Sequence, residues 1–136
     1  MAHQFNREQK LSYLDMTLRF GEAWIEIFQG DTDFYSAAFW DLFTNLWRAD
    51  QPVRKTDAMG YMKAVKSAHT AGKYVDTAIE KALLEETDNP DDARSKLIVL
   101  TPDMRARLDT YMDKAANEVL IAGREINSLG TVPEEG

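Results

Sequence analysis

The chain has 136 residues, of which 44% are hydrophobic and 29% are charged, and its formal net charge is −7 at pH 7. This composition is typical of a soluble globular protein and excludes a disordered or fibrous chain. The absence of cysteine and the presence of only two histidines exclude disulfides and thiolate chemistry and disfavour a metal site. No apolar run approaches the roughly 18 residues of a membrane span, and the N-terminus has no hydrophobic signal core, so we expect a cytoplasmic protein without a membrane partner.

The first half of the chain predicts two helices. Over residues 7–29, Leu11, Leu14 and Leu18 recur at helical spacing, and aromatic residues widen the apolar face beyond what a helix lying singly on a small core needs. Gly30 is expected to end this helix, and the Asp-Thr-Asp sequence that follows starts another. The second helix, over residues 34–49, is the most aromatic stretch and is predicted to be the centre of the core.

A helix-turn-helix is predicted for the middle of the chain. A short helix is expected at about residues 54–62, and Ser67 is a good N-cap for a helix over residues 68–82. In that second helix small apolar residues face inward and polar residues lie on the outer arc. Two such helices joined by a short turn are typical of a helix-turn-helix.

The residues that follow predict a β-hairpin. Residues 83–87 and 96–100 are expected to be its strands, with Asn89-Pro90 as a turn and with Arg94 and Lys96 at the tip. A hairpin with a basic flank directly after a helix-turn-helix is a wing.

The end of the chain predicts a capped helix and a tail. Thr101 as N-cap, Pro102 at the first position and Asp103 beside the positive helix end predict a helix over residues 103–129. Residues 130–136 are expected to be a flexible tail. The whole is predicted to be a single domain over residues 1–136, mainly α with a small β-hairpin wing. The expected order is α-α-α-α-β-β-α, with a winged helix-turn-helix core over residues 34–100.

Residues 40–112 resemble the winged helix of the multiple-antibiotic-resistance regulator (MarR) family. Residues 70–84, TAGKYVDTAIEKALL, resemble the family's recognition helix, and residues 92–103, DARSKLIVLTPD, resemble its wing, including a D-x-R element kept as Asp92 and Arg94. The chain departs from the family pattern in four places. Ala82 and Met104 replace glycines, and Thr77 and Ala93 replace arginines.

The resemblance implies a bacterial transcriptional regulator of repressor type that binds double-stranded DNA. The recognition helix would enter the major groove, while Arg94, held by Asp92, would enter the minor groove. The residues expected to contact bases or phosphates are Ser67, His69, Thr70, Lys73, Tyr74, Thr77, Arg94 and Lys96, with Lys55, Lys63 and Lys66 as further phosphate contacts. The alternative is an ordinary solvated surface on which Arg94 pairs with a neighbouring aspartate.

The charge pattern bears on this hypothesis. Residues 54–100 hold 8 of the 16 basic side chains and 8 of the 23 acidic ones, so this segment is neutral within an acidic chain. Phosphate binding depends on the local patch rather than on the total. The sequence has no glycine-rich phosphate loop and no paired nucleophile and histidine, so we expect neither an enzyme nor a cofactor.

The helices over residues 7–29 and 103–129 are predicted to form a homodimer interface, because their apolar arcs exceed what a domain of this size buries. The expected interface residues are Leu11, Leu14, Leu18, Tyr111, Ala115, Val119 and Ile126. The alternative is that the two helices cover only their own domain. In a dimer, two recognition helices about 34 Å apart would read a pseudo-palindrome with half-sites about 10 bp apart.

Two further hypotheses remain open from the sequence. Members of the family bind small aromatic or anionic effectors between the dimer helices and the winged domain. The resemblance therefore implies a pocket lined by Trp24, Tyr35, Trp40 and Trp47, for which plain core packing is the alternative. The second hypothesis is a winged-helix protein-interaction module without significant DNA affinity, which the acidic total and the missing arginines at positions 77 and 93 favour.

Overall fold

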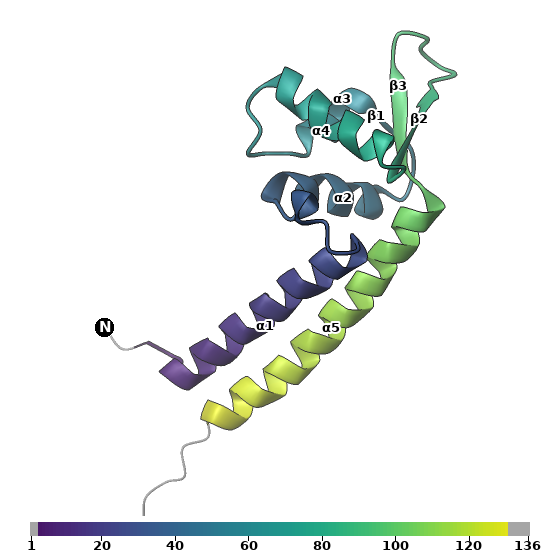
Figure 1. Ribbon diagram of the computed structural model, residues 1–136. Coiled ribbons are helices and arrows are strands. Elements are labelled where there is room, and N and C mark those ends of the chain that lie inside the picture. Colours follow the sequence, from purple (N-terminus) through teal and green to yellow (C-terminus); the bar gives the residue numbers. More distant parts are fainter. Residues whose placement is uncertain (1–2, 131–136) are drawn as a thin grey trace, which may run out of the picture. The chain divides into compact units, whose positions relative to one another are not determined.

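The structure, a computed structural model, describes residues 3–130. Those residues form two compact units, one of residues 3–30 with 110–130 and the other of residues 31–109. We call them the helical pair and the winged unit. In chain order the elements are α1 (Arg7–Ile27), η1 (Thr32–Phe34), α2 (Ala37–Ala49), β1 (Val53–Arg54), α3 (Lys55–Gly60), α4 (Ala68–Glu80), β2 (Leu84–Asp88), β3 (Lys96–Leu100) and α5 (Pro102–Gly130), as Figure 1 shows.

The winged unit is built on α2, α3, α4 and a three-stranded antiparallel sheet of order β1-β3-β2. Its core takes side chains from every one of these helices and from β2 and β3, together with the first residues of α5. The buried set includes Leu42, Phe43, Leu46, Ala58, Met62, Val75, Ala78, Leu84, Ile98, Leu100, Met104 and Leu108. The aromatic stretch over residues 34–49 therefore contributes to the centre of the core, as its composition predicts.

The start of α2 differs from the sequence prediction. The prediction of one helix over residues 34–49 is wrong at its N-terminus. The chain first forms the short 3₁₀ helix η1, and α2 begins only at Ala37. Each start has its own cap. The Asp31 carboxylate accepts a hydrogen bond from the Asp33 amide at 3.0 Å, and the Ser36 hydroxyl accepts one from the Phe39 amide at 3.2 Å. Two competing caps divide one apolar stretch into two helices.

The helix-turn-helix consists of α3 and α4. The predicted cap is confirmed, since the Ser67 hydroxyl accepts a hydrogen bond from the Thr70 amide at 3.3 Å and α4 begins at Ala68. The helix ends at Glu80, two residues before the predicted end. Ala82, which follows, has a φ of +60°, a left-handed conformation that interrupts a right-handed helix.

The wing has one strand more than the hairpin that the sequence predicts. Its arms, β2 and β3, lie within one residue of the predicted strands, and Lys96 lies opposite Asp88 in the arm rather than at the tip. The additional strand is β1, whose Val53 pairs with Ile98 and whose Arg54 pairs with Leu97 of β3. A strand of two residues is too short to show the alternation by which strands are found in a sequence.

The last helix begins where its cap predicts. The Thr101 hydroxyl accepts a hydrogen bond from the Met104 amide at 3.2 Å, and α5 starts at Pro102. The helix continues through Gly130, so this residue is helical and does not belong to a tail. The rest of the predicted tail, residues 131–136, lies outside the described residues.

The helical pair consists of α1 and residues 110–130 of α5, which run side by side (Figure 1). Asn6 and Gln9 form a capping box at the start of α1, and the Gln9 amide donates to the carbonyl of Ile126 at 2.8 Å. Arg19 forms an ion pair with Glu118 at 2.5 Å. At the other end the Trp24 ring meets that of Tyr111 edge-on, with 5.2 Å between centroids.

The first helix ends at Ile27, two residues earlier than predicted. Both Gln29 and Gly30 have positive φ angles, +58° and +87°, left-handed conformations that cannot continue a right-handed helix. Over residues 3–130 no helix combines the length and the apolar character that crossing a bilayer requires.

Candidate nucleic-acid interface

The outer surface of α4 is the first part of the candidate interface. His69, Thr70 and Lys73 are exposed, while Ala71 and Val75 on the opposite side are buried in the core. Ser67 is exposed as well, although its hydroxyl is already the acceptor for the Thr70 amide. The helix thus offers short polar side chains and one cation, groups that can bond to phosphates and base edges.

Tyr74 and Thr77 are half-buried, unlike the other predicted contacts of α4. The Tyr74 ring packs edge-on against Phe39 of α2, with 5.0 Å between centroids and 83° between planes. Both residues line an open hollow of about 330 Å³ together with Thr70, Lys73, Asp33 and Phe39. Tyr74 therefore contributes to the packing of α4 against α2. Its position on the polar arc of the predicted helix does not indicate this role.

The tip of the wing is shaped by its own polar side chains. The Asp92 carboxylate accepts a hydrogen bond from the Arg94 amide at 3.0 Å and lies 3.4 Å from the Arg94 guanidinium. The side-chain oxygen of Asn89 accepts one from the Asp91 amide at 3.0 Å. These are Asx turns, which fix a loop without a regular ladder. The side chain of Arg94 is 92% exposed, so the loop presents it to solvent.

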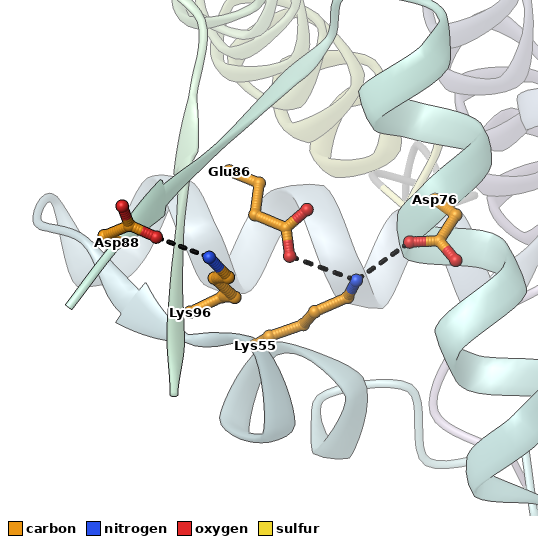
Figure 2. A network of polar contacts seen from close by, with 5 residues as sticks. All are labelled: Lys55, Asp76, Glu86, Asp88 and Lys96. Carbon is orange, nitrogen blue, oxygen red and sulfur yellow. Dashed lines mark hydrogen bonds and ion pairs between the residues drawn. The ribbon is translucent and has the colours of Figure 1, made fainter. Parts of the chain in front are cut away.

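Two of the predicted phosphate contacts are held in ion pairs (Figure 2). The Lys55 ammonium lies 2.9 Å from Asp76 of α4 and 3.3 Å from Glu86 of β2. Lys96 pairs with Asp88 across the hairpin. The hydrogen bond to Asp88 raises the pKa of Lys96, and the same bond lowers the pKa of Asp88. Carboxylates on α4 and the wing thus neutralise these two cations within the protein.

Three other predicted cations are exposed. Lys63 and Lys66 lie in the turn between α3 and α4, and Lys73 lies on α4 itself. Among residues 3–130 none of the three has an ion-pair partner. The predicted cations therefore fall into three groups. Lys63, Lys66 and Lys73 form a free set, Lys55 and Lys96 form a paired set, and Arg94 stands at the tip of the wing. Only the free set and Arg94 can meet a phosphate without breaking a close pair.

The aromatic residues of the predicted effector pocket have different surroundings. Trp24 is buried against Phe28 and Tyr111, and Tyr35 and Trp40 are exposed. The indole of Trp47 donates a hydrogen bond to Asp109 at 2.8 Å. Trp24 belongs to the helical pair and the other three belong to the winged unit. The effector pocket stays a prediction.

The predicted dimer residues lie on the helical pair. Leu11, Leu14, Leu18 and Val119 are exposed, Ala115 and Ile126 are half-buried, and Tyr111 is buried. Burial raises the pKa of Tyr111, which packs on Trp24 within the pair. The exposed leucines of α1 are one turn apart and form a stripe along the helix. Within residues 3–130 no three histidine or carboxylate side chains are placed to hold a metal ion.

Comparison with proteins of known structure identifies the fold. The sequence matches no family model and no curated protein. A putative MarR-like transcription regulator from Bacillus cereus has a similar structure, with 15% identity, a TM-score of 0.53, and coverage of 86% of this chain and 81% of that one. Heme-free PefR is similar at 14% identity and a TM-score of 0.51, covering 82% and 97% of the two chains. A probable transcriptional regulator from Pseudomonas aeruginosa shares 23% identity over 90% and 82%, with a TM-score of 0.49. The chain has the winged helix-turn-helix fold of MarR-like proteins.

Proposed function

We propose that the protein is a homodimeric, sequence-specific DNA-binding regulator of transcription that acts as a repressor on a pseudo-palindromic operator. The observation that carries the proposal is the pairing, within one compact unit, of an exposed polar helix with an exposed wing-tip arginine. A helix of this kind fits the major groove, and a wing beside it reaches the adjacent minor groove. The similar fold of MarR-like regulators supports the proposal.

The recognition helix in this proposal is α4. Thr70 and Lys73 lie near its N-terminal end, and the turn before it holds Lys63 and Lys66. The N-terminus of a helix favours anions, because its free amides and its dipole both face them. A phosphate near Ser67 would therefore meet a favourable field as well as two or three lysines.

Arg94 is the wing's contact. Its guanidinium extends from a loop that Asp92 and Asn89 brace. The neighbouring Asp92 carboxylate, at 3.4 Å, is a loose partner that a narrow minor groove with its stronger negative potential can replace. An arginine whose backbone is braced and whose guanidinium is only loosely paired suits insertion into a groove.

Dimerisation is the second part of the proposal. The exposed stripe of Leu11, Leu14 and Leu18 on α1, with Leu18 at 64% exposure, and the exposed Val119, Leu120 and Ile121 of α5 lie on the helical pair. Apolar side chains gathered in this way on a soluble protein mark an association surface, and a symmetric dimer is the commonest solution. Two copies of α4 about 34 Å apart would then read half-sites about 10 bp apart.

A small aromatic or anionic effector is a further proposed partner. Exposed aromatic rings at Tyr35 and Trp40 are groups on which a flat ligand can stack. Such a ligand would control DNA binding only if its affinity differed between the DNA-bound and free forms of the protein.

The rival function is a winged-helix protein-interaction module. The ion pairs of Lys55 and Lys96 favour it, because they leave fewer free cations on the winged unit for phosphate binding. The two functions differ in their response to salt. Binding to DNA phosphates weakens steeply as salt is added, with a slope of about −0.9 per phosphate contact in a plot of log K against log salt concentration.

The test is in vitro selection of a duplex from random sequence, followed by fluorescence-anisotropy titration at two salt concentrations. The variants are wild type, Arg94→Ala and Arg124→Ala. The last removes the same charge from an exposed position in the helical pair. The proposal expects salt-sensitive binding that prefers the selected duplex and falls about tenfold or more in Arg94→Ala alone, as the loss of one specific arginine contact does. No enrichment in the selection and no binding at low salt would contradict it.

A further inference from the structure

The Lys55 side chain connects three elements of the winged unit. Its backbone is the first residue of α3, directly after β1, and β1 pairs with β3. Its ammonium reaches Asp76 of α4 at 2.9 Å and Glu86 of β2 at 3.3 Å (Figure 2). One amine at the edge of the sheet thus bonds the recognition helix on one side and the outer strand of the wing on the other.

These bonds lie beyond the packed junction of α4 and the wing. At that junction the Leu83 amide donates to the Ala78 carbonyl at 2.9 Å, and Leu84 is buried. Glu86 is two residues farther along β2 toward the tip, and Asp76 is two residues farther back in α4 than Ala78. A junction at one point leaves a strand free to pivot, whereas a second tie away from it fixes the direction of the strand.

The Lys55 ammonium is ion-paired with both carboxylates and is largely shielded from solvent. Its side chain is 26% exposed, against 49% for Lys96. Burial acts to lower the pKa of Lys55, but the hydrogen bonds to Asp76 and Glu86 outweigh it and raise that pKa above its ordinary value. The amine is therefore charged at neutral pH and bonded on two sides, which leaves little of it for a phosphate.

We propose that Lys55 is a positioning residue that holds the recognition helix α4 and the wing at one fixed spacing through Asp76 and Glu86. The sequence alone suggests a phosphate contact at this position, and the proposal replaces that role. It rests on the proposed function, because the spacing between α4 and the wing matters where the two enter neighbouring grooves. Fixed spacing sets how many base pairs separate the major-groove and minor-groove contacts, and so contributes to discrimination between sequences.

The first experiment measures the spacing in the free protein. The chain contains no cysteine, so the substitutions His69→Cys and Ala93→Cys allow spin labels to be attached at exposed positions on α4 and the wing. Pulsed electron paramagnetic resonance then gives the distribution of distances between the two labels. Lys55→Met is expected to broaden the distribution, and Lys55→Arg, which can bond both carboxylates, is expected to restore it. Glu86→Gln should broaden it too. Its matched control, Glu85→Gln, removes the same charge from the neighbouring exposed residue of β2 and should not.

The second experiment measures DNA discrimination, as the ratio of dissociation constants for a scrambled and a selected duplex. A positioning role predicts that Glu86→Gln lowers this ratio about tenfold, since one well-placed base contact contributes discrimination of that order. A phosphate-contact role for Lys55 predicts an unchanged ratio with tighter binding to both duplexes, because removing Glu86's charge would free the lysine for the phosphates of any sequence. Glu85→Gln measures the effect of the lost charge alone.

The outcomes separate the two proposals. An unchanged distance distribution in Lys55→Met, with circular dichroism like that of wild type, overturns the positioning role. So does equal discrimination in Glu86→Gln and Glu85→Gln. If Lys55→Met does not fold, Asp76→Asn tests the same tie with the lysine kept. If wild type binds no DNA selectively while the distances broaden as expected, the regulatory function fails and the tie between helix and wing stands.

Discussion

The hydroxyl of Thr101 donates a hydrogen bond to the main-chain carbonyl of Ala82, 3.0 Å away. The same hydroxyl accepts a hydrogen bond from the Met104 amide and so caps α5. One side chain therefore begins the last helix and also binds the segment that follows α4. Ala82 reaches this position only by adopting a left-handed backbone conformation, with a φ of +60°.

Replacing Ala82 by glycine is expected to stabilise the protein by about 0.5–1 kcal/mol. An L-residue in the left-handed region costs roughly 1–2 kcal/mol relative to its right-handed conformation, and the greater freedom of glycine in the unfolded chain offsets part of the gain. The measurement is the denaturation midpoint at fixed protein concentration. Ala82→Val, which is stiffer still at this φ, should destabilise. A lower midpoint for Ala82→Gly would contradict the argument.

Ser12 offers a second stability test, in the helical pair. Its side chain is 4% exposed, and among the described residues its hydroxyl has no hydrogen-bond partner. A buried hydroxyl without a partner costs about 1–3 kcal/mol. We expect Ser12→Ala to raise the free energy of unfolding by about 1 kcal/mol in urea titrations. The control is Thr17→Ala, which removes a hydroxyl bonded to the Leu14 carbonyl at 2.7 Å and should not stabilise.

The proposed dimer depends on the leucine stripe of α1. Leu18→Glu places a charge where Leu18 is 64% exposed, so the fold of one subunit should tolerate it while a dimer interface should not. Sedimentation equilibrium is expected to give a dimer for wild type and a monomer for the variant, with at least tenfold weaker operator binding. Tyr35→Glu, at an exposed site in the winged unit, serves as the control. A monomeric wild type would refute the dimer.

The ion pair of Lys96 with Asp88 predicts a pH dependence in the wing. The hydrogen bond from Lys96 lowers the pKa of Asp88, so its contribution to folding is present above the carboxyl's ordinary pKa and is lost as the pH falls through the lowered value. A carboxyl-carbon NMR titration should find the midpoint of Asp88 below the ordinary range of an aspartate, and Lys96→Met should return it to that range. Equal midpoints in wild type and variant would show that the pair is absent in solution.

Much of the winged helix could be predicted from local signals. The caps at Ser67 and Thr101 fix where α4 and α5 begin, because each hydroxyl satisfies a free amide within three residues. The two long strands of the wing follow from β-branched residues beside a turn-forming loop. The helix ends were predicted less well. Ala82 and Gln29 adopt positive φ angles that their residue types do not indicate.

The candidate interface was only partly predictable. Arg94 and Lys73 are predicted contacts by their charge and their place in a motif, and the structure exposes both. Only the charge of Lys55 predicts a phosphate contact, and its carboxylate partners are 21 and 31 residues away in the chain. No local pattern reveals such partners. Tyr74 likewise falls on a polar arc and yet packs on Phe39 of α2.

The sequence by itself determined the order of the long helices and of the two long wing strands, the starts of α1, α4 and α5, and the identity of the cations, because caps, turns and periodicity act over a few residues. Only the tertiary structure decided which cations are free. Lys73 and Lys55 are the same residue type on neighbouring helices, but within residues 3–130 the fold brings two carboxylates to Lys55 and none to Lys73. Pairing between charges depends on distances of a few ångströms between distant segments of the chain, and those distances exist only once the core has packed.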